Sequence, residues 1–456
     1  MKIKRVKWKD HPVLGDLLLD FENASDGKPY GTIIFAGENG VGKSTVLWDL
    51  SSFLNLGSFK YFEYIEYIAN GKNLKVVPTT DGNTHPNFFD LIDQSGSPTK
   101  IRADRNLNRQ LVDSNVEDLR HYGCVFSRAR SDYKTEKIVS TTASELDKDR
   151  YDLDERDNFT SLKQLIVDIV NQDHSDYAAQ NQLLGAHPKT WDAFFVDSKL
   201  ARFQSSFDNF FERLAYDRVV DEGGEKLIKF KKNGKSIPID SLSTGEKQIV
   251  FRGIYLLKNS KALTNAAVMI DEPELSMHPK WQTRILKYYK DLFTPLGGGQ
   301  TAQLFVATHS DHVLKRALEN QSDNVVIVLS ETHGVIQAKK IDAPAVLPSI
   351  TSAETNYLAF DLISNDYHIE LYGYLQDKKA LRTVKDCDEY IKLNTHGFYN
   401  PGIHAKATSH TVGTRTTYYD TLPTAVRNAI HHPSSTNTFT DQDLKTSIEL
   451  LIELCR

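Results

Sequence analysis

Cysteine is scarce in this sequence of 456 residues, and long apolar runs are missing from it. Cys124, Cys387 and Cys455 are an odd number and lack metal-ligand spacing, which argues against a disulfide framework and fits a reducing cytoplasm. No run approaches membrane-spanning length, and the N-terminal segment MKIKRVKWKDH has no apolar region typical of a signal peptide. These absences predict a cytoplasmic protein without a membrane partner.

A large excess of charge of one sign is also missing. Lys and Arg number 55 against 60 Asp and Glu, which gives a formal net charge of −5. Any surface for nucleic acid would therefore have to be local. Arg102, Arg105 and Arg109 have the spacing of one helix face and could follow the phosphates of DNA. A solvated face balanced by Asp104 and Asp113 is the alternative that we favour.

A glycine-rich segment, residues 37–44 (GENGVGKS), matches the phosphate-loop pattern G-x-x-x-x-G-K-[ST]. It lies between the apolar run 33–36, which predicts a buried strand, and residues 44–54, whose spacing predicts a helix, so a plain glycine turn is disfavoured. We expect Lys43 to reach the β- and γ-phosphates of ATP, and the Ser44 hydroxyl to hold Mg²⁺. The predicted ATP contacts in this segment are Gly37, Asn39, Gly40, Gly42, Lys43, Ser44 and Thr45.

Two further apolar runs, 267–270 and 304–307, predict parallel strands with polar residues at their carboxyl ends. After the first run, Asp271 suits the second shell of Mg²⁺, and Glu272 beside it can polarise the attacking water. An acidic helix cap is the alternative for this pair. His309 follows the second run, where an imidazole can contact the γ-phosphate or the water, although a lone histidine is more often structural.

Residues 242–248 (LSTGEKQ) place a serine and a glycine at the predicted start of a helix. Such a turn offers backbone N–H groups and a hydroxyl to an anion, so Ser243, Gly245 and Glu246 are predicted ATP contacts. Ser243 and Glu246 also match an N-terminal capping box, and the two interpretations are compatible.

Together these segments resemble the ABC ATPase family, with GENGVGKST as Walker A, LSTGEKQ as signature, VMIDEPELSMHP as Walker B and D-loop, and ATHS as H-loop. The resemblance implies an α/β ABC-ATPase head (a P-loop NTPase) that uses ATP and Mg²⁺. It also implies a homodimer or higher oligomer whose copies close around ATP. In that arrangement Asp271 coordinates Mg²⁺, Glu272 is the catalytic base and His309 is the switch. Ser243 and Gly245 contact ATP held by the other copy, and Ser276 of the D-loop touches that copy.

The motifs divide the chain into four parts. We expect residues 1–60 and 201–345 to form the ATPase core, and residues 61–200 to form a mixed, mainly helical insertion lobe. Residues 346–456 are expected to be a helical C-terminal segment that binds a partner.

The insertion and the tail resemble a more specific family. FSRAR (126–130), ETNYLAF (354–360), YHIELYGY (367–374) and RNAIHHP (427–433) are similar to segments of PtuA, the ATPase subunit of Septu anti-phage systems, some of which accompany retrons. This resemblance implies a regulatory ATPase that controls a separate HNH endonuclease, PtuB. It leaves DNA or a retron nucleic acid open as a further partner.

Two other functions stay open. Arg427 and His432 form R-x4-H, the short motif of HEPN ribonucleases, so the chain could cut RNA by itself. We favour a structural interpretation, a helix C-terminus at His431 and His432 stopped by Pro433, or a role in partner binding. A DNA-repair or DNA-tethering ABC ATPase without a dedicated nuclease is the other function.

Overall fold

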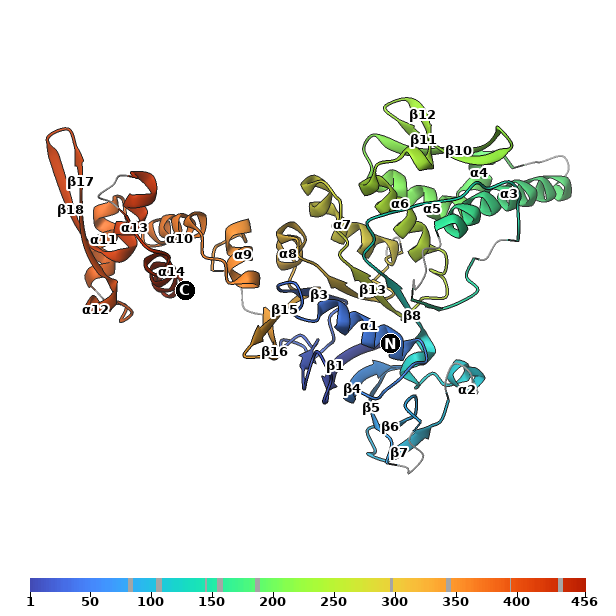
Figure 1. Ribbon diagram of the computed structural model, residues 1–456, viewed down its shortest axis with the longest axis horizontal. Coiled ribbons are helices and arrows are strands. Elements are labelled where there is room, and N and C mark those ends of the chain that lie inside the picture. Colours follow the sequence, from blue (N-terminus) through green and yellow to red (C-terminus); the bar gives the residue numbers. More distant parts are fainter. Residues whose placement is uncertain are drawn as a thin grey trace. The chain divides into compact units, whose positions relative to one another are not determined.

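The computed structural model describes residues 1–80, 85–103, 109–143, 146–153, 159–184, 189–295, 298–341, 346–393, 395–433 and 438–456. These residues form two compact units, Met1–Lys340 and Ile341–Arg456 (Figure 1), and each unit is described by itself. Within the described ranges, no helix combines the length and the apolar composition that crossing a membrane requires.

A seven-stranded sheet forms the centre of the first unit, in the order β16-β15-β3-β14-β13-β8-β9. In this order the strands are Val335–Ile341, Asn324–Thr332, Thr32–Ala36, Gln303–Ala307, Ala267–Asp271, Cys124–Ser127 and Tyr151–Asp152. All neighbours from β15 to β9 run parallel. Every residue of β3, β13 and β14 is buried, as expected for continuous apolar runs inside a parallel sheet.

The register of the three central strands decides where the motifs lie. Phe35 of β3 is opposite Ala307 of β14, and Ala307 is opposite Asp271 of β13. The segments that follow these three strands therefore leave the sheet at one edge.

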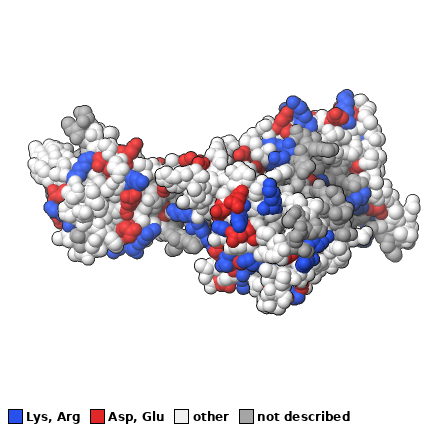
Figure 2. Space-filling view, turned by 60° about the horizontal axis from the view of Figure 1, so that its bottom comes forward, with Lys and Arg blue, Asp and Glu red and all other residues white. Residues whose placement is uncertain are grey.

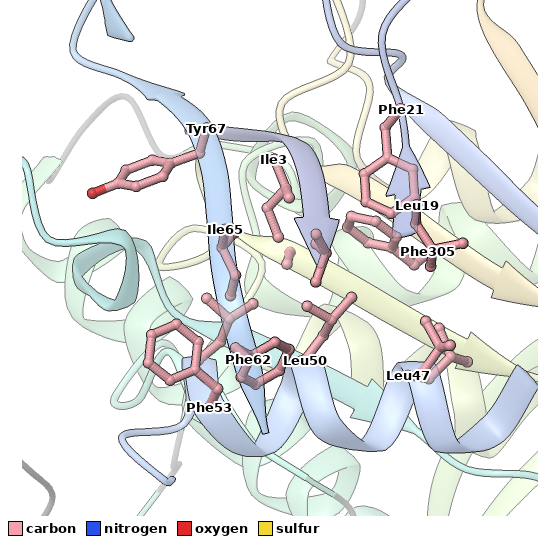
Figure 3. Close-up of a cluster of buried hydrophobic side chains, with 14 of the residues drawn as sticks. Ile3, Leu19, Phe21, Leu47, Leu50, Phe53, Phe62, Ile65, Tyr67 and Phe305 are labelled. Carbon is pink, nitrogen blue, oxygen red and sulfur yellow. The ribbon is translucent and has the colours of Figure 1, made fainter. Parts of the chain in front are cut away.

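A second sheet of six antiparallel strands has the order β2-β1-β4-β5-β6-β7. These strands are Leu18–Asp20, Lys2–Trp8, Phe62–Ala69, Lys72–Pro78, Phe89–Ile92 and Pro98–Ile101. Their buried side chains join those of α1 (Lys43–Leu54) in one apolar cluster. In Figure 3, Leu50 and Phe53 of α1 lie beside Phe62 of β4, and Leu47 lies further along the same helix. Because α1 also packs on β8, β13 and β14, this helix is buried against both sheets.

The region 61–200 differs from the mainly helical insertion that the sequence predicts. Its strand β8 lies inside the central sheet beside β13, and β4–β7 make up most of the antiparallel sheet. β8 is only four residues long. In β4 (FEYIEYIA) four residues are not buried, and two of them, Glu63 and Glu66, are charged and interrupt its apolar pattern. The long helix of this region, α3 (Phe159–Leu184), lies in its second half, and α5 (Lys199–Phe210) begins where the region ends.

The signature begins a helix, and two further helices follow the strands that lead into the later motifs. A three-stranded antiparallel sheet precedes α6, while α7 and α8 follow β13 and β14 (Figure 1). These elements are β10 (Leu214–Glu222), β11 (Glu225–Lys232), β12 (Lys235–Pro238), α6 (Thr244–Leu257), α7 (Pro279–Leu292) and α8 (Asp311–Leu318). The unit also contains two short helices, α2 (Arg109–Ser114) and α4 (Trp191–Phe195).

The second unit contains six helices and a two-stranded ribbon within its described residues. The helices are α9 (Ser352–Phe360), α10 (Asn365–Lys378), α11 (Val384–Leu393), α12 (Pro401–His404), α13 (Leu422–His431) and α14 (Asp441–Cys455). The sequence predicts a helical segment here, and the antiparallel ribbon of β17 (Ala405–Val412) and β18 (Arg415–Thr421) is an addition to it. The unit has its own apolar core, in which Leu371, Val426, Ile448 and Leu451 are fully buried.

Phe53 provides a test of the core between α1 and the antiparallel sheet. Its ring centroid lies 5.1 Å from that of Phe59, 5.7 Å from that of Phe62 and 5.5 Å from that of Phe89. Phe53→Ala is expected to lower the free energy of unfolding by about 3–5 kcal/mol, since it removes a fully buried ring. Urea unfolding followed by tryptophan fluorescence measures this in the first unit, where all four tryptophans lie.

Val139→Ala is the matched control, because this side chain is 70% exposed. Its effect should stay within about 0.5 kcal/mol. Equal losses in the two variants would contradict the assignment of this core.

Candidate functional site

The phosphate loop connects β3 to α1 and depends on glycine at two points. Gly37 has φ 132°, and a Cβ there would overlap the carbonyl oxygen of Leu329. Gly42 caps α1 in the left-handed conformation, with φ 90°, and a Cβ there would strike Leu14. These conformations are accessible to glycine without steric cost, and they leave the first N–H groups of α1 uncapped by any side chain. Such a helix N-terminus is suited to bind an anion.

Lys43 is the first residue of α1 and lies inside this loop. Its Nζ donates hydrogen bonds to the carbonyl oxygens of Gly37 at 2.9 Å and Glu38 at 2.7 Å. Burial lowers the pKa of the Lys43 ammonium to about 8, although the carboxylates of Asp271 and Glu272 raise it in part. The loop therefore holds a lysine whose charge is poorly solvated, a condition that an anionic ligand would relieve.

Ser44 of α1 and Asp271 of β13 are in direct contact. The Ser44 hydroxyl donates to Asp271 Oδ1 at 3.1 Å. Burial raises the pKa of Asp271, and the hydrogen bond from Ser44 opposes the rise. A hydroxyl and a carboxylate are the hard oxygen donors that Mg²⁺ binds alongside substrate phosphates, so these two residues fit the ion that the sequence predicts.

Glu272 and His309 lie on neighbouring loops at the same edge. Glu272 Oε1 is 3.8 Å from His309 Nε2, and about a third of each side chain is exposed. Burial lowers the pKa of His309 and the charge of Lys43 lowers it further, while a hydrogen bond with the Gly37 backbone acts in the opposite direction. A neutral imidazole therefore lies between the carboxylate that would polarise water and the phosphate loop.

The backbone of Glu272 is in the left-handed region, with φ 43°. A non-glycine residue in this region costs free energy, and such residues often occur where a side chain must be aimed at a ligand. The carbonyl oxygen of Glu272 accepts a hydrogen bond from Arg252 at 3.3 Å, and the same guanidinium donates to the Arg128 carbonyl at 2.7 Å. Arg252 thus supports the main chain of the candidate base.

The sequence interpretation missed two residues of this neighbourhood. Arg252 is a buried charge inside the apolar run IVFRGIYLL of α6, and that interruption is a signal that could have found it. Glu274 follows the Asp271–Glu272 pair by two residues, and its carboxylate accepts the backbone N–H of His309 at 2.8 Å. Burial raises the pKa of Glu274. Its acidic neighbours in the sequence obscured this separate role.

The signature residues form the predicted capping box at the start of α6. The Ser243 side chain accepts the Glu246 N–H, and Glu246 Oε2 accepts the Ser243 N–H at 2.8 Å. Burial would raise the pKa of Glu246, but hydrogen bonds from Lys232 and Ser243 outweigh it and hold the pKa below its usual value. The Glu246 carboxylate is thus already occupied within the chain. Its contact with ATP stays a prediction.

Gly245 lies against the loop that follows Walker B. A Cβ on Gly245 would come within 2.8 Å of the Ser276 carbonyl oxygen and 3.4 Å of the Trp281 ring. Among the residues that the structure describes, no hydrogen bond or ion pair joins Ser243 or Gly245 to the phosphate loop. Their action on a second copy stays a prediction, as does the contact of Ser276 with that copy.

The remaining predicted ATP contacts are accessible. Asn39, Gly40 and Ser44 are exposed, and Thr45 is partly buried. The chain therefore brings Lys43, Ser44, Asp271, Glu272 and His309 together at one edge of the sheet, with the open part of the phosphate loop beside them.

The predicted arginine stripe is not a helix face. Arg102 precedes α2 in a coil, and its guanidinium donates to the Phe89 carbonyl at 2.8 Å and to Asp90 at 3.1 Å. Arg109 pairs with Asp149 at 3.0 Å, and Arg105 lies outside the described residues. On the face that Figure 2 shows, Lys and Arg side chains are interspersed with Asp and Glu. The balanced, solvated interpretation therefore fits Arg109, and Arg102 serves the fold.

The pKa of Lys43 gives a prediction for nucleotide binding. With a pKa of about 8, Lys43 is protonated at pH 7 and mostly neutral at pH 9, and the ammonium is the form that phosphates bind. We expect the Kd for ATP with Mg²⁺ to rise about tenfold between pH 7 and pH 9. Calorimetry above pH 8 should also register proton uptake on binding.

Lys43→Ala is the control for this titration. It should bind ATP at least about tenfold more weakly at pH 7, a loss of about 1.4 kcal/mol, and lose the pH dependence. A wild-type Kd that stays constant over this range would refute the role of Lys43.

Three solved structures are similar to this chain at low sequence identity. Among solved structures, an SMC head bound to the C-terminal winged-helix domain of ScpA has 14% identity, covers 75% of this chain and 98% of its own, and superposes with a TM-score of 0.41. The SMC head domain from Thermotoga maritima has 14% identity, coverages of 75% and 100%, and a TM-score of 0.36. An SMC head with an extended coiled coil, bound to the C-terminal domain of ScpA derived from Pyrococcus furiosus, has 14% identity, coverages of 75% and 96%, and a TM-score of 0.39.

The family comparison is more informative. One family model matches residues 33–315, which include the phosphate loop, the signature, the Walker B carboxylates and His309. The predicted mixed α/β P-loop NTPase fold is confirmed. This chain belongs to the family described as "AAA domain, putative AbiEii toxin, Type IV TA system".

Proposed function

We propose that this chain is an ATPase whose two copies close around ATP and Mg²⁺ and control a partner protein. The observation that carries the proposal is the convergence at one sheet edge of Lys43, the Ser44–Asp271 pair and the Glu272–His309 pair. A cation, a hydroxyl–carboxylate pair and a carboxylate–imidazole pair match the needs of phosphoryl transfer to water.

Each residue has one task in the proposed reaction. Lys43 and the N–H groups at the start of α1 bind the phosphates. Ser44 and Asp271 hold Mg²⁺, which neutralises charge on the phosphate oxygens. Glu272 takes a proton from the attacking water, and His309, neutral at pH 7, orients that water or the γ-phosphate.

The second copy enters through the signature. The Ser243 N-cap and Gly245 begin α6, and Gly245 lies beside the loop of Ser276. The ABC resemblance of LSTGEKQ supports their use on ATP that the other copy holds. We infer two composite sites, each with a phosphate loop from one copy and a signature from the other.

Substitution of the base tests the proposed reaction. Glu272→Gln removes the proton acceptor but keeps the shape of the side chain, so turnover should fall by about 10²–10⁴-fold. ATP binding should remain, because Lys43 and Ser44 are untouched. Steady-state hydrolysis measures the first effect, and sedimentation with ATP and Mg²⁺ should show the dimer accumulating. Wild-type turnover in this variant would contradict the assignment of the base.

A mixture of two inactive variants tests whether each ATP site is formed by two copies. Lys43→Ala disables the phosphate loop, and Ser243→Arg blocks the signature. In a mixed dimer one composite site has both defects and the other has neither, so mixing should restore part of the hydrolysis. Sites formed within a single copy would give no recovery.

We further propose that the C-terminal unit recruits an HNH endonuclease, in an anti-phage system of the Septu type. Four large apolar side chains of this unit support a docking role, since 72% of Leu393, 47% of Phe398, 58% of Ile403 and 68% of Tyr418 are exposed. The resemblance of the tail to PtuA supplies the identity of the partner.

The contacts of Arg427 and His432 favour recruitment over ribonuclease chemistry in this chain. Arg427 Nη1 donates to the neighbouring Asn428 side chain at 3.1 Å, and the His432 ring stacks on His410 with centroids 4.2 Å apart. His431 ends α13 and His432 caps it, where basic groups favourably meet the helix dipole. Both motif side chains thus have structural neighbours.

A digestion assay distinguishes the two roles. The purified chain should leave RNA and DNA intact with Mg²⁺ or with EDTA, and addition of the HNH partner should restore cutting. RNA cleavage by the chain alone in EDTA, abolished by Arg427→Ala in a folded protein, would instead identify a ribonuclease. His432→Ala separates assembly from chemistry, since it should weaken only partner binding.

A further inference from the structure

Glu274 is a carboxylate of the candidate site to which the proposed reaction assigns no task. It lies in the loop between β13 and α7, three residues after Asp271. Its Oε1 accepts the backbone N–H of His309 at 2.8 Å, and its Oε2 is buried. The bond therefore joins the loop that carries Glu272 to the loop that carries His309.

The pairing of β14 with β3 ends at this point. The N–H of Thr308 donates to the Phe35 carbonyl at 3.0 Å, which continues the pairing of β14 with β3. The next N–H, that of His309, donates to Glu274 instead. A carboxylate that accepts a backbone N–H forms a charge-assisted bond, which is stronger than a bond between neutral groups.

A second side chain from the segment after Walker B holds Ser310, the residue that follows His309. Gln282 of α7 accepts the Ser310 hydroxyl at 2.7 Å, and the Ser310 side chain in turn caps α8 by accepting the Val313 N–H. Glu274 therefore binds the main chain of His309, and Gln282 binds the side chain of the next residue. Its imidazole has a defined position, 3.8 Å from Glu272.

We propose that Glu274 is a positioning residue, which fixes the main chain of His309 through this hydrogen bond and so keeps the imidazole beside Glu272. The inference rests on the proposed ATPase function for its catalytic consequence. The hydrogen bond itself belongs to the chain without nucleotide and can be tested there. Glu274 contacts neither phosphate nor water in this role and acts only through His309.

Two substitutions separate the hydrogen bond from general loss of structure. Glu274→Ala removes the acceptor, whereas Glu274→Gln keeps a carbonyl oxygen of the same reach. Glu319→Ala is the matched control, because Glu319 caps α8 at its far end and pairs with Arg316 on the surface. This control should behave as the wild type in both measurements below.

Hydrogen–deuterium exchange in the nucleotide-free protein tests the bond directly. In Glu274→Ala the amide of His309 should exchange at least about tenfold faster, while peptides from β13 and β3 keep wild-type exchange. Glu274→Gln should retain most of the protection. Wild-type exchange at His309 in Glu274→Ala would overturn the proposal whether or not the chain hydrolyses ATP.

Steady-state kinetics tests the consequence. Glu274→Ala should lower kcat by about 10–100-fold, because small misplacement of a catalytic group is costly, while KM for ATP changes less than about threefold. Glu274→Gln should recover kcat to within about threefold of the wild type. Equal losses in both variants would assign the effect to the charge of Glu274 and overturn the positioning role. A wild type without hydrolysis would refute the ATPase proposal alone, since the exchange measurement would still decide the role of Glu274.

Discussion

The candidate site depends on the register between β3, β14 and β13. Phe35, Ala307 and Asp271 lie side by side across the sheet, so the phosphate loop, the His309 loop and the Walker B loop begin within about one residue of each other. A slip of one residue in a buried strand would turn its side chains to the opposite face of the sheet. Because every residue of these strands is buried, such a slip would place side chains of different size in close-packed positions on both faces.

The loops at this edge are held in conformations that an isolated chain would avoid. Glu272 and Ser276 are non-glycine residues with positive φ, 43° and 59°. Such conformations cost about 1–3 kcal/mol each and persist only where the surroundings fix them. Here the fixing contacts are the Arg252 bond to the Glu272 carbonyl, the Glu274 bond to His309 and the close packing of Gly245 on Ser276. The two glycines of the phosphate loop avoid this cost because they lack a Cβ.

The sequence predicted the parts of the fold that depend on short-range pattern. The runs 267–270 and 304–307 read as strands because both faces are apolar, and the phosphate loop and the capping box are local motifs. β8 could not be recognised in the same way. It has four residues, and its place beside β13 is set by a parallel pairing across about 140 residues of chain. The antiparallel sheet was missed for a related reason, since only half of the residues of β4 are buried and Glu63 and Glu66 are among the others.

The same distinction applies within the site. Lys43, Ser44, Asp271, Glu272 and His309 each follow a recognisable strand, so their meeting at one edge could be predicted. The supporting contacts are made by side chains that reach a main-chain group of another loop, as Arg252 does at Glu272 and Glu274 at His309. A sequence motif shows which residue carries the chemistry, but a main-chain group on another loop, whether N–H or carbonyl, is the same in every residue type and gives no such signal. Supporting residues of this kind become visible only when the loops have been placed in space.

Gly245 shows what this arrangement implies for communication through one copy. It begins the signature helix, and a side chain at this position would press on the Ser276 carbonyl. Ser276 lies two residues after Glu274, whose carboxylate holds His309. Packed interiors do not compress. A shift of the signature by about the width of a methyl group would therefore move the loop that positions both Glu272 and His309. The signature, which we expect to contact ATP held by the other copy, therefore packs directly against a loop of its own copy's site.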